Sequence, residues 1–234
     1  MKRATAKSKA KSPIEKRVKL PLKARKRVVI TAGPTREYID PVRFLSNESS
    51  GRMGFALAQR AAELGHKVTL IAGPVCLETP PGVTRVDIVS ARDLLAATKK
   101  AFREADALFM AAAVADFRPA RKLAGKWRKK DDGSDEASIA LVKNPDVLAT
   151  VAKQKGERVV IGFALETGNG LRRARAKLVR KNLDYIALND ASALNATRSS
   201  VTILGSDGSL LELVDQLKEL IADALLGLPG MSSR

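Results

Sequence analysis

The stretch that decides the fold is "RVVITAGPTREYIDPVRFLSNESSGRMGFALAQ", residues 27–59. Residues 27–33 are mostly apolar or β-branched, which predicts a buried strand. After a long loop, a helical pattern begins near "SSGRMG", with Gly54, Leu57, Ala58 and Ala61 on one face. The stretch therefore predicts a strand, a long loop and a helix, which is the repeating unit of an α/β fold.

A loop rich in glycine and serine that enters a helix is typical of a phosphate-binding site. The spacing here matches neither a P-loop nor a dinucleotide-binding fingerprint, because Gly51 and Gly54 lie far along the chain from Gly33. The stretch indicates an anion site of a different kind, and it also contains Arg43 and Asn47.

The rest of the body alternates strands and helices. Further strands are predicted at 67–73, 84–89, 106–114, 158–165, 183–189 and 200–205. Further helices are predicted at 90–105, 144–154, 169–182 and 213–227. Nearly continuous apolar strands separated by amphipathic helices predict a Rossmann-like α/β fold, in which helices cover both faces of a mostly parallel sheet.

Residues 119–143 interrupt this alternation. The polar run "KWRKKDDGSDE" precedes the short alternating segment "ASIALVK". We expect a flap or hairpin that crosses the active site.

Composition narrows the class of protein. The 234 residues are 45% hydrophobic, enough for a full core. No apolar run approaches the roughly 20 residues that a membrane helix needs, and the start lacks the apolar stretch of a signal peptide. The single cysteine, Cys76, excludes an internal disulfide and a Cys-based zinc site. We expect a cytoplasmic protein.

The net charge of +17 is unevenly spread. Residues 1–27 hold 12 Lys or Arg against one acid, Glu15, and so contribute +11. This composition predicts a disordered basic arm over 1–26, followed by one domain over 27–230. Clustered basic residues attract phosphate without sequence preference, so weak contact between the arm and nucleic acid is one expectation.

Ligands in such sheets bind beyond the carboxyl ends of the strands. Small residues Ala111 to Ala113 and the polar Asp116 follow one predicted strand there. In "KNPDVL" (143–148) we expect Asn144 at a helix N-cap and Pro145 at the first helical position. Lys177 and Lys181 share a helix face, where their repulsion would be relieved by an anion between them. This convergence predicts a nucleotide site.

Several blocks together resemble the phosphopantothenate–cysteine ligase family. They are "ITAGPTREYIDPVRFLSNESSGRMG", "AAAVADFRPA", "KNPDVL", "GFALET" and "KLVRKNLDYIALND", in the family's order and spacing over residues 27–220. The resemblance implies a ligase of coenzyme A biosynthesis that joins 4′-phosphopantothenate to L-cysteine. It implies CTP as co-substrate with Mg²⁺, and a homodimer with the substrate site near the subunit interface. The family's flavin-dependent decarboxylase half is absent, so we expect a stand-alone ligase.

The resemblance also implies site residues. Catalytic roles fall to Asn47, Arg43 and Lys126, and substrate contacts to Arg43, Asn47 and Asn189. Nucleotide contacts fall to Gly33, Ser50, Gly51, Met53, Gly54, Ala111, Ala112, Ala113, Asp116, Lys126, Pro145, Asp146, Val147, Leu148, Phe163, Lys177 and Lys181. One departure is Glu48, which stands where the family commonly has a basic residue.

The chemistry that the resemblance implies needs no protein nucleophile. The carboxylate attacks the α-phosphate of the nucleotide, and the amine of cysteine then displaces the nucleoside monophosphate. Catalysis would rest on positioning and charge stabilisation. This agrees with a chain that has no convincing triad, and we expect His66 to be a surface turn residue and Cys76 to be passive.

Two other function classes compete. A short-chain NAD(P)-dependent oxidoreductase needs a Tyr-x-x-x-Lys pair, but the two tyrosines, Tyr38 and Tyr185, are followed four residues later by Val42 and Asn189. The strand at 67–73 also lacks a following acid for a ribose. A nucleic-acid-binding protein is suggested by the basic charge, but aromatic residues for base stacking make up only 4% of the chain.

Overall fold

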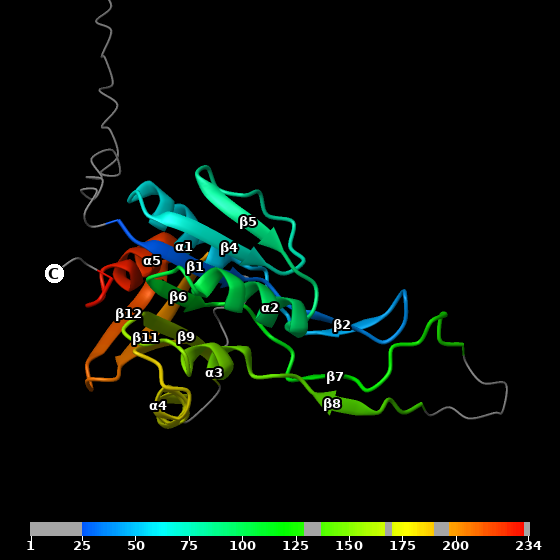
Figure 1. Ribbon diagram of the computed structural model, residues 1–234. Helices are drawn as coiled ribbons and strands as arrows, with labels where there is room; N and C mark the ends of the chain where they lie inside the picture. The colour runs from blue at the N-terminus through cyan, green and yellow to red at the C-terminus, as the bar shows by residue number, and fades with distance from the viewer. Residues whose placement is uncertain (1–24, 129–136, 167–169, 190–196, 232–234) are drawn as a thin grey trace, which may run out of the picture.

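The computed structural model describes residues 25–128, 137–166, 170–189 and 197–231. Its centre is an eight-stranded sheet in the order β12-β11-β10-β9-β6-β1-β4-β5 (Figure 1). The strands are β1 (Arg27–Ala32), β4 (Lys67–Ala72), β5 (Val83–Asp87), β6 (Ala107–Met110), β9 (Val159–Leu165), β10 (Tyr185–Asn189), β11 (Arg198–Gly205) and β12 (Leu210–Leu217). The six strands from β10 to β5 are parallel, and β11 and β12 are antiparallel to their neighbours.

Helices cover both faces, which confirms the predicted fold class (Figure 1). On one face lie α1 (Arg52–Glu63) and α5 (Lys218–Leu226); on the other lie α2 (Ala91–Phe102), α3 (Val147–Ala152) and α4 (Gly170–Arg180). Alternate residues of β1 enter the two cores, with Val28 and Ile30 in the first and Val29 in the second. None of the helices in the described part of the chain is long and apolar enough to cross a membrane.

Side chains near the N-termini of α2 and α3 cap the helices or connect loops. Helix α2 begins with a capping box between Ser90 and Asp93. Helix α3 begins at Val147 with Asp146 as its N-cap, so the prediction of Asn144 as N-cap was wrong. The side chain of Asn144 instead donates from Nδ2 to the carbonyl oxygen of Ala115 at 2.8 Å, which ties two loops together.

Helix α1 packs closely on β1 because its third residue is Gly54. A Cβ atom at this position would lie 2.5 Å from the Cβ of Ala32 and 2.9 Å from the carbonyl oxygen of Thr31. Both distances are too short for unstrained packing. The glycine therefore allows the helix to approach the strand at the entrance to the site.

Two short antiparallel pairs extend from the sheet body (Figure 1). One is β2 (Arg36–Tyr38) with β3 (Phe44–Ser46), within the stretch predicted as a long loop; the other is β7 (Phe117–Pro119) with β8 (Leu141–Lys143). We call these two pairs, with the described residues 39–43, 120–128 and 137–140 that join their strands, the arm; it is distinct from the basic arm predicted over 1–26. The predicted hairpin is therefore present as the β7–β8 pair, which extends from the sheet body (Figure 1). Residues 129–136 lie outside the described residues.

Two other boundaries differ from the predictions. The helix predicted at 213–227 is divided, because residues 210–217 form the edge strand β12 and α5 begins at Lys218. Strand β6 ends at Met110 and not at 114, so Ala111 to Val114 form a loop that lines the site. The predicted basic arm over 1–26 lies almost wholly outside the described residues.

Candidate active site

The site lies where the chain reverses its direction of travel across the sheet. From β1 the chain proceeds to β4 and β5 on one side, and it returns through α2 to β6 on the other side of β1. The carboxyl ends of β1 and β6 therefore form the switch point at which doubly wound sheets bind ligands. The predicted location of the site agrees with this topology.

Hydrogen bonds hold the loops after β1 and β6 together. The amide of Ala113 donates to Gly33 O at 2.9 Å, and the amide of Thr35 donates to Ala113 O at 3.2 Å. The buried hydroxyls of Thr31 and Thr35 accept from the amides of Ala112 and Ala115 at 3.1 and 3.0 Å. These bonds fix the loop backbone before any ligand arrives.

The larger of two adjoining pockets has a volume of about 650 Å³, which is within the usual range of about 300–1,000 Å³ for small-molecule sites. It is lined by the loop before α1, by the start of α1, by the loop after β6, and by the ends of β9 and β10. The residues are Ser46 to Gly54, Ala111 to Val114, Asp116, Phe163 to Leu165, Lys177, Asn189 and Lys218.

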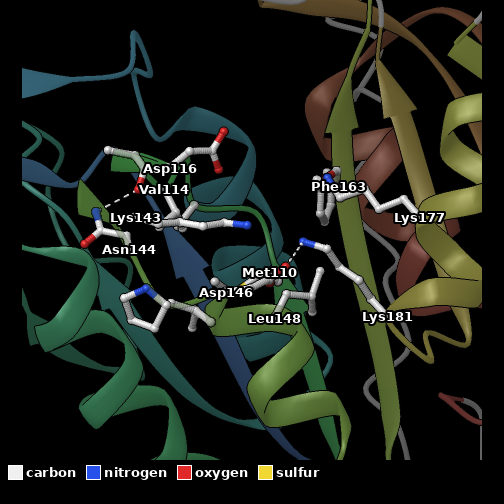
Figure 2. Close-up of a pocket in the computed structure, with 14 residues that line it drawn as sticks. Met110, Val114, Asp116, Lys143, Asn144, Asp146, Leu148, Phe163, Lys177 and Lys181 are labelled. Carbon is white, nitrogen blue, oxygen red and sulfur yellow. Dashed lines mark hydrogen bonds and ion pairs between the residues drawn. The ribbon is translucent and has the colours of Figure 1, made fainter. Parts of the chain in front are cut away.

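The smaller pocket lies between β6, α3 and α4 (Figure 2). It shares Ala112, Val114, Asp116, Phe163 and Lys177 with the larger pocket, so the two form one connected site. The remaining lining residues are Met110, Ala115, Lys143 to Leu148 and Lys181.

Lys177 and Lys181 face the smaller pocket from α4, but each has a partner (Figure 2). Lys177 donates from Nζ to the carbonyl oxygen of Phe163 at 2.8 Å, and Lys181 forms an ion pair with Asp146 at 2.7 Å. Partners within the chain therefore relieve the repulsion for which an anion was expected. Burial, followed by the charge of Lys181, lowers the pKa of Lys177 from its ordinary value. Burial raises the pKa of Asp146, but hydrogen bonds from Lys181 and the Ala149 amide outweigh it and lower the pKa overall.

Asn47 lines the larger pocket and is held by a hydrogen bond across it. Its Nδ2 donates to the carbonyl oxygen of Val114 at 3.0 Å. The neighbouring Ser46 donates from Oγ to the carbonyl oxygen of Thr35 at 2.8 Å. These bonds connect the loop before α1 to the loops that follow β1 and β6.

Arg43 and Lys126 lie on the arm, and neither is among the described residues that line the two pockets. Arg43 donates to Asp40 Oδ2 at 2.7 Å and to the carbonyl oxygen of Trp127 at 3.0 Å. Asp40 is buried, which raises its pKa, but hydrogen bonds from the amides of Trp127, Val42 and Arg43 hold that pKa well below its usual range. Arg43 thus helps to order the arm within this chain.

Of the other predicted residues, Ser50, Gly51, Met53, Gly54, Ala111, Ala113 and Asn189 line the larger pocket, and Pro145, Val147 and Leu148 line the smaller one. Gly33 lies behind the pocket wall with a φ of 74°. A Cβ there would be 2.9 Å from the side chain of Val75. Its contribution is to the tight turn after β1.

The sequence reasoning missed two basic residues of the larger pocket. Arg52 is the first residue of α1, inside the quoted "SSGRMG", and its position in a phosphate-like loop was a usable signal. Lys218 is the first residue of α5 and only 7% exposed. A single lysine within a predicted amphipathic helix gives no signal of burial in a pocket.

His66 is buried, with 5% exposure, so the expectation of a surface turn residue was wrong. It precedes β4, at the end of the sheet opposite the site. Its Nδ1 accepts from the amide of Lys26 at 3.0 Å, and its buried Nε2 has no partner among the described residues. Burial and the charge of Lys26 lower the pKa of His66. Cys76 is exposed in the loop after β4, and among the described residues it does not line either pocket.

With this geometry in view, the chain was compared with known proteins. Residues 23–228 match the family described as "DNA/pantothenate metabolism flavoprotein C-terminal domain". The chain belongs to this family. The match includes every strand of the central sheet and both pockets.

Relatives support the same assignment. The chain is 45% identical over 204 residues to the coenzyme A biosynthesis bifunctional protein CoaBC of Escherichia coli strain K12, covering 85% of this chain and 50% of that protein. It is 47% identical over 188 residues to CoaBC of Vibrio cholerae, covering 78% of this chain and 47% of the relative. The chain thus spans about half the length of the curated relatives it matches.

A solved structure agrees over nearly its full length. The crystal structure of the C-terminal domain of coenzyme A biosynthesis bifunctional protein CoaBC superposes with a TM-score of 0.76 and is 38% identical in sequence. The superposition covers 89% of this chain and 96% of that domain.

Proposed function

We propose that this chain is a phosphopantothenate–cysteine ligase, which forms the amide between 4′-phosphopantothenate and L-cysteine at the expense of a nucleoside triphosphate. The observation that carries the proposal is convergence. Five sequence blocks that are far apart in the chain line one connected site at the β1/β6 switch point, in a chain that belongs to the family. The coenzyme A biosynthesis proteins among its relatives support the substrate assignment.

The proposed reaction has two steps. In the first, a carboxylate oxygen attacks the α-phosphorus of the nucleotide, which forms an acyl-nucleotide and expels pyrophosphate. In the second, the amine of cysteine attacks the acyl carbon, loses a proton, and expels the nucleoside monophosphate. Each step develops negative charge on oxygen, which fixed donors and cations stabilise.

The residues of the site suit these steps. The small side chains of Ala111 to Ala113 let a ligand approach this backbone closely, while the amides of Ala112 and Ala113 are held by hydrogen bonds within the protein. Lys177 lines both pockets and can contact phosphate oxygens that lie between them. Asn47 can donate to the acyl oxygen, because an amide nitrogen carries two hydrogens and only one is used on Val114.

CTP is the nucleotide that we propose, with Mg²⁺ as its companion. Among the described residues, no group of three or more His, Cys, Asp or Glu side chains could hold a metal alone. Mg²⁺ that accompanies a nucleotide typically uses phosphate oxygens and about one or two carboxylates. Asp116, which lines both pockets, is the carboxylate that fits this role. When bound, the ion would neutralise charge on the phosphates.

Pyrophosphate release tests the proposal directly. The purified protein is incubated with 4′-phosphopantothenate, L-cysteine and Mg²⁺, and with each of the four ribonucleoside triphosphates in turn. We expect release that requires the acid substrate and is fastest with CTP. A higher kcat/KM with ATP would contradict the nucleotide assignment alone, and the absence of release with all four would contradict the ligase assignment.

We further propose that the protein acts as a homodimer whose arm completes the partner's site. The arm carries Arg43 and Lys126, neither of which is among the described residues that line the pockets of its own chain. It also exposes large apolar side chains, including Val42 at 61%, Phe117 at 50% and Leu141 at 47%. Docking of the arm on a second copy would cover these side chains.

Subunit mixing tests this arrangement. Arg43→Ala and Asn47→Asp variants are each expected to be nearly inactive. If Arg43 serves the partner's pocket, random mixing of the two variants should restore about a quarter of wild-type activity. About half of the dimers then contain one subunit of each kind, and each such dimer has one intact site of its two. A mixture that stays inactive would show that both residues act in the same chain.

A further inference from the structure

Helix α4 concentrates positive charge on the surface of the body. Its 11 residues contain no acidic side chain and five basic ones, which are Arg172, Arg173, Arg175, Lys177 and Arg180. By contrast, α1, α2 and α5 each contain at least one acidic residue. The positive charge of α4 is therefore not balanced within the helix.

The two sides of α4 have different environments. On the inner side, Ala174 and Leu178 are buried in the core, and Lys177 lines both pockets. Figure 1 shows α4 at a margin of the molecule, on the face of the sheet opposite α1 and α5. The outer side consists of the exposed residues Arg172, Arg173, Arg175, Val179 and Arg180, which we call the arginine face. None of these five residues lines either pocket of the site.

The charges of the arginine face are largely uncompensated. Arg173 forms an ion pair with Glu166 at 3.0 Å, whereas Arg172, Arg175 and Arg180 have no acidic partner in the described part of the chain. Arg172 and Arg175 are three positions apart, so their charges repel on the helix surface. Arg172 also lies in the first turn of α4, where the helix dipole disfavours a cation. A partner that brings negative charge to this face would relieve both effects.

The residue types indicate the chemistry of that partner. The planar guanidinium group of arginine can donate two parallel hydrogen bonds to a phosphate. At about 1.5 Å per residue, Arg172 and Arg180 are about 12 Å apart along the helix axis, a length over which a nucleic-acid duplex presents about seven phosphate charges. Helix α4 contains no aromatic residue on which an unpaired base could stack. The face therefore fits the backbone of a duplex better than a single strand.

An anionic membrane fits this face less well. A helix that lies in a membrane interface needs a broad apolar side next to its basic residues. The arginine face has a single large apolar side chain, Val179, which is 76% exposed. The observations therefore favour a partner that is held by phosphate contacts alone.

We propose that the arginine face of α4 binds the phosphate backbone of double-stranded nucleic acid without base recognition. This surface belongs to the folded body and is distinct from the basic arm predicted over 1–26. It is also independent of the proposed ligase reaction, because Lys177 faces the pockets from the other side of the helix.

Fluorescence anisotropy with a labelled duplex of about 20 base pairs tests the proposal. The whole 234-residue chain is used, so the contribution of residues 1–26 is common to all variants. In one variant Arg172, Arg175 and Arg180 are each replaced by glutamine, which is a good helix former. In the matched control, three exposed basic residues of α2 are replaced by glutamine, with the same change in charge: Arg92, Lys99 and Lys100.

We expect the α4 variant to bind the duplex about 10- to 100-fold more weakly at about 0.1 M salt. The slope of log K against log salt concentration should become less steep by about one for each arginine removed. The α2 control should lose less than about threefold, because charges beyond about 10 Å are screened at this salt concentration. Equal weakening in the two variants would show that net charge alone decides binding, and it would overturn the proposal.

Two further variants separate a phosphate contact from a loss of structure. Replacement of the same three arginines by lysine should keep the salt slope, because the charge is retained, and should weaken binding less than glutamine does. If the triple glutamine variant has a lower thermal stability, the single substitution Arg175→Gln should still reduce the slope by about one. An unchanged slope for Arg175→Gln would overturn the proposal.

Two other binding partners give recognisable results. Binding to vesicles of phosphatidylcholine with about 30% phosphatidylserine that requires the three arginines, with duplex binding unaffected by their loss, would overturn the proposal and assign the face to a membrane. A preference of more than about tenfold among duplexes of different sequence would overturn recognition by the backbone alone.

The pyrophosphate assay distinguishes this surface from the ligase site. The α4 glutamine variant should retain the wild-type kcat/KM, since its three substituted residues line neither pocket. A large loss of turnover in a folded variant would overturn the separation of the two sites. A wild-type protein that binds the duplex through α4 but releases no pyrophosphate would contradict the ligase assignment and support the arginine face.

Discussion

Replacement of Asn47 by aspartate should separate the two steps of the proposed reaction. In the structure, Nδ2 of Asn47 donates to Val114 O at 3.0 Å, which orients the amide and leaves its second N–H for a ligand in the pocket. An aspartate carboxylate has no hydrogen to donate. It would also place negative charge beside the Val114 carbonyl and beside an acyl oxygen that becomes negative.

The size of the effect follows from when that oxygen becomes charged. During acyl-nucleotide formation the bonds change at phosphorus, and the acyl carbon stays trigonal. When cysteine adds, an oxyanion develops on the acyl oxygen, and loss of one donor to such an oxyanion costs about 10²–10³ in rate. The same substitution should lower the free energy of unfolding only slightly, because one exposed hydrogen bond contributes only about 0.5–1.5 kcal/mol to stability.

The assay is a single-turnover experiment with labelled nucleotide. Asn47→Asp should release one equivalent of pyrophosphate at near the wild-type rate and then accumulate acyl-nucleotide, with amide formation slowed about 10²–10³-fold. Asn47→Ser, which keeps a short donor, serves as the matched control and should be slowed less. Equal slowing of both steps would refute the reasoning and assign Asn47 to shaping the loop, as would a large loss of thermal stability.

Three further predictions concern other parts of the molecule. Gly54→Ala should lower the free energy of unfolding by about 1–2 kcal/mol in urea, because the clash with Ala32 exceeds the gain in helix propensity. Gly125→Ala, where a Cβ meets no atom within 4 Å, is the control, and equal stability of the two variants would contradict the packing argument. His66 has a lowered pKa in the folded state, so its contribution to stability is complete above about pH 6.5 and is lost as pH falls towards the folded-state pKa. Wild type should thus lose more stability between pH 7.5 and 5.5 than His66→Asn, which keeps an acceptor for the Lys26 amide, and parallel pH curves would contradict this. Lys126→Ala should slow acyl-nucleotide formation more than amide formation in single-turnover assays, because a cation on the triphosphate acts in the first step; an unchanged first step would remove Lys126 from the site.

The apolar periodicity of the sequence was enough to predict the sheet and most of its helices. Continuous apolar strands such as 67–73 and 158–165 are buried on both faces, so their identity depends little on context. The predicted ligand site followed from the same order, because parallel strands bring their carboxyl ends to one edge. Thus most predicted pocket residues, including Asn47, Asp116 and Phe163, line one site.

Local patterns failed where a partner outside the segment decides the outcome. Residues 213–217 were predicted as the start of a helix, but pairing with β11 makes them part of the edge strand β12. Asn144 has the residue type of an N-cap, but its amide group is better satisfied by Ala115, and Asp146 caps the helix instead. In both cases the competing hydrogen bonds come from outside the segment, from the adjacent strand of a hairpin for β12 and from a residue 29 positions earlier for Asn144.

The sequence by itself determined the order of strands and helices, the parallel sheet and the edge at which ligands bind, because these depend on side-chain periodicity within short segments. Only the tertiary structure decided the burial of Lys218 and His66, the pairing of Lys181 with Asp146, and the direction in which the arm carries Arg43. The physical reason is that burial and charge pairing depend on which helices and loops pack together. Those contacts join residues that can be more than a hundred positions apart, such as Arg60 of α1 and Asp223 of α5, which form an ion pair.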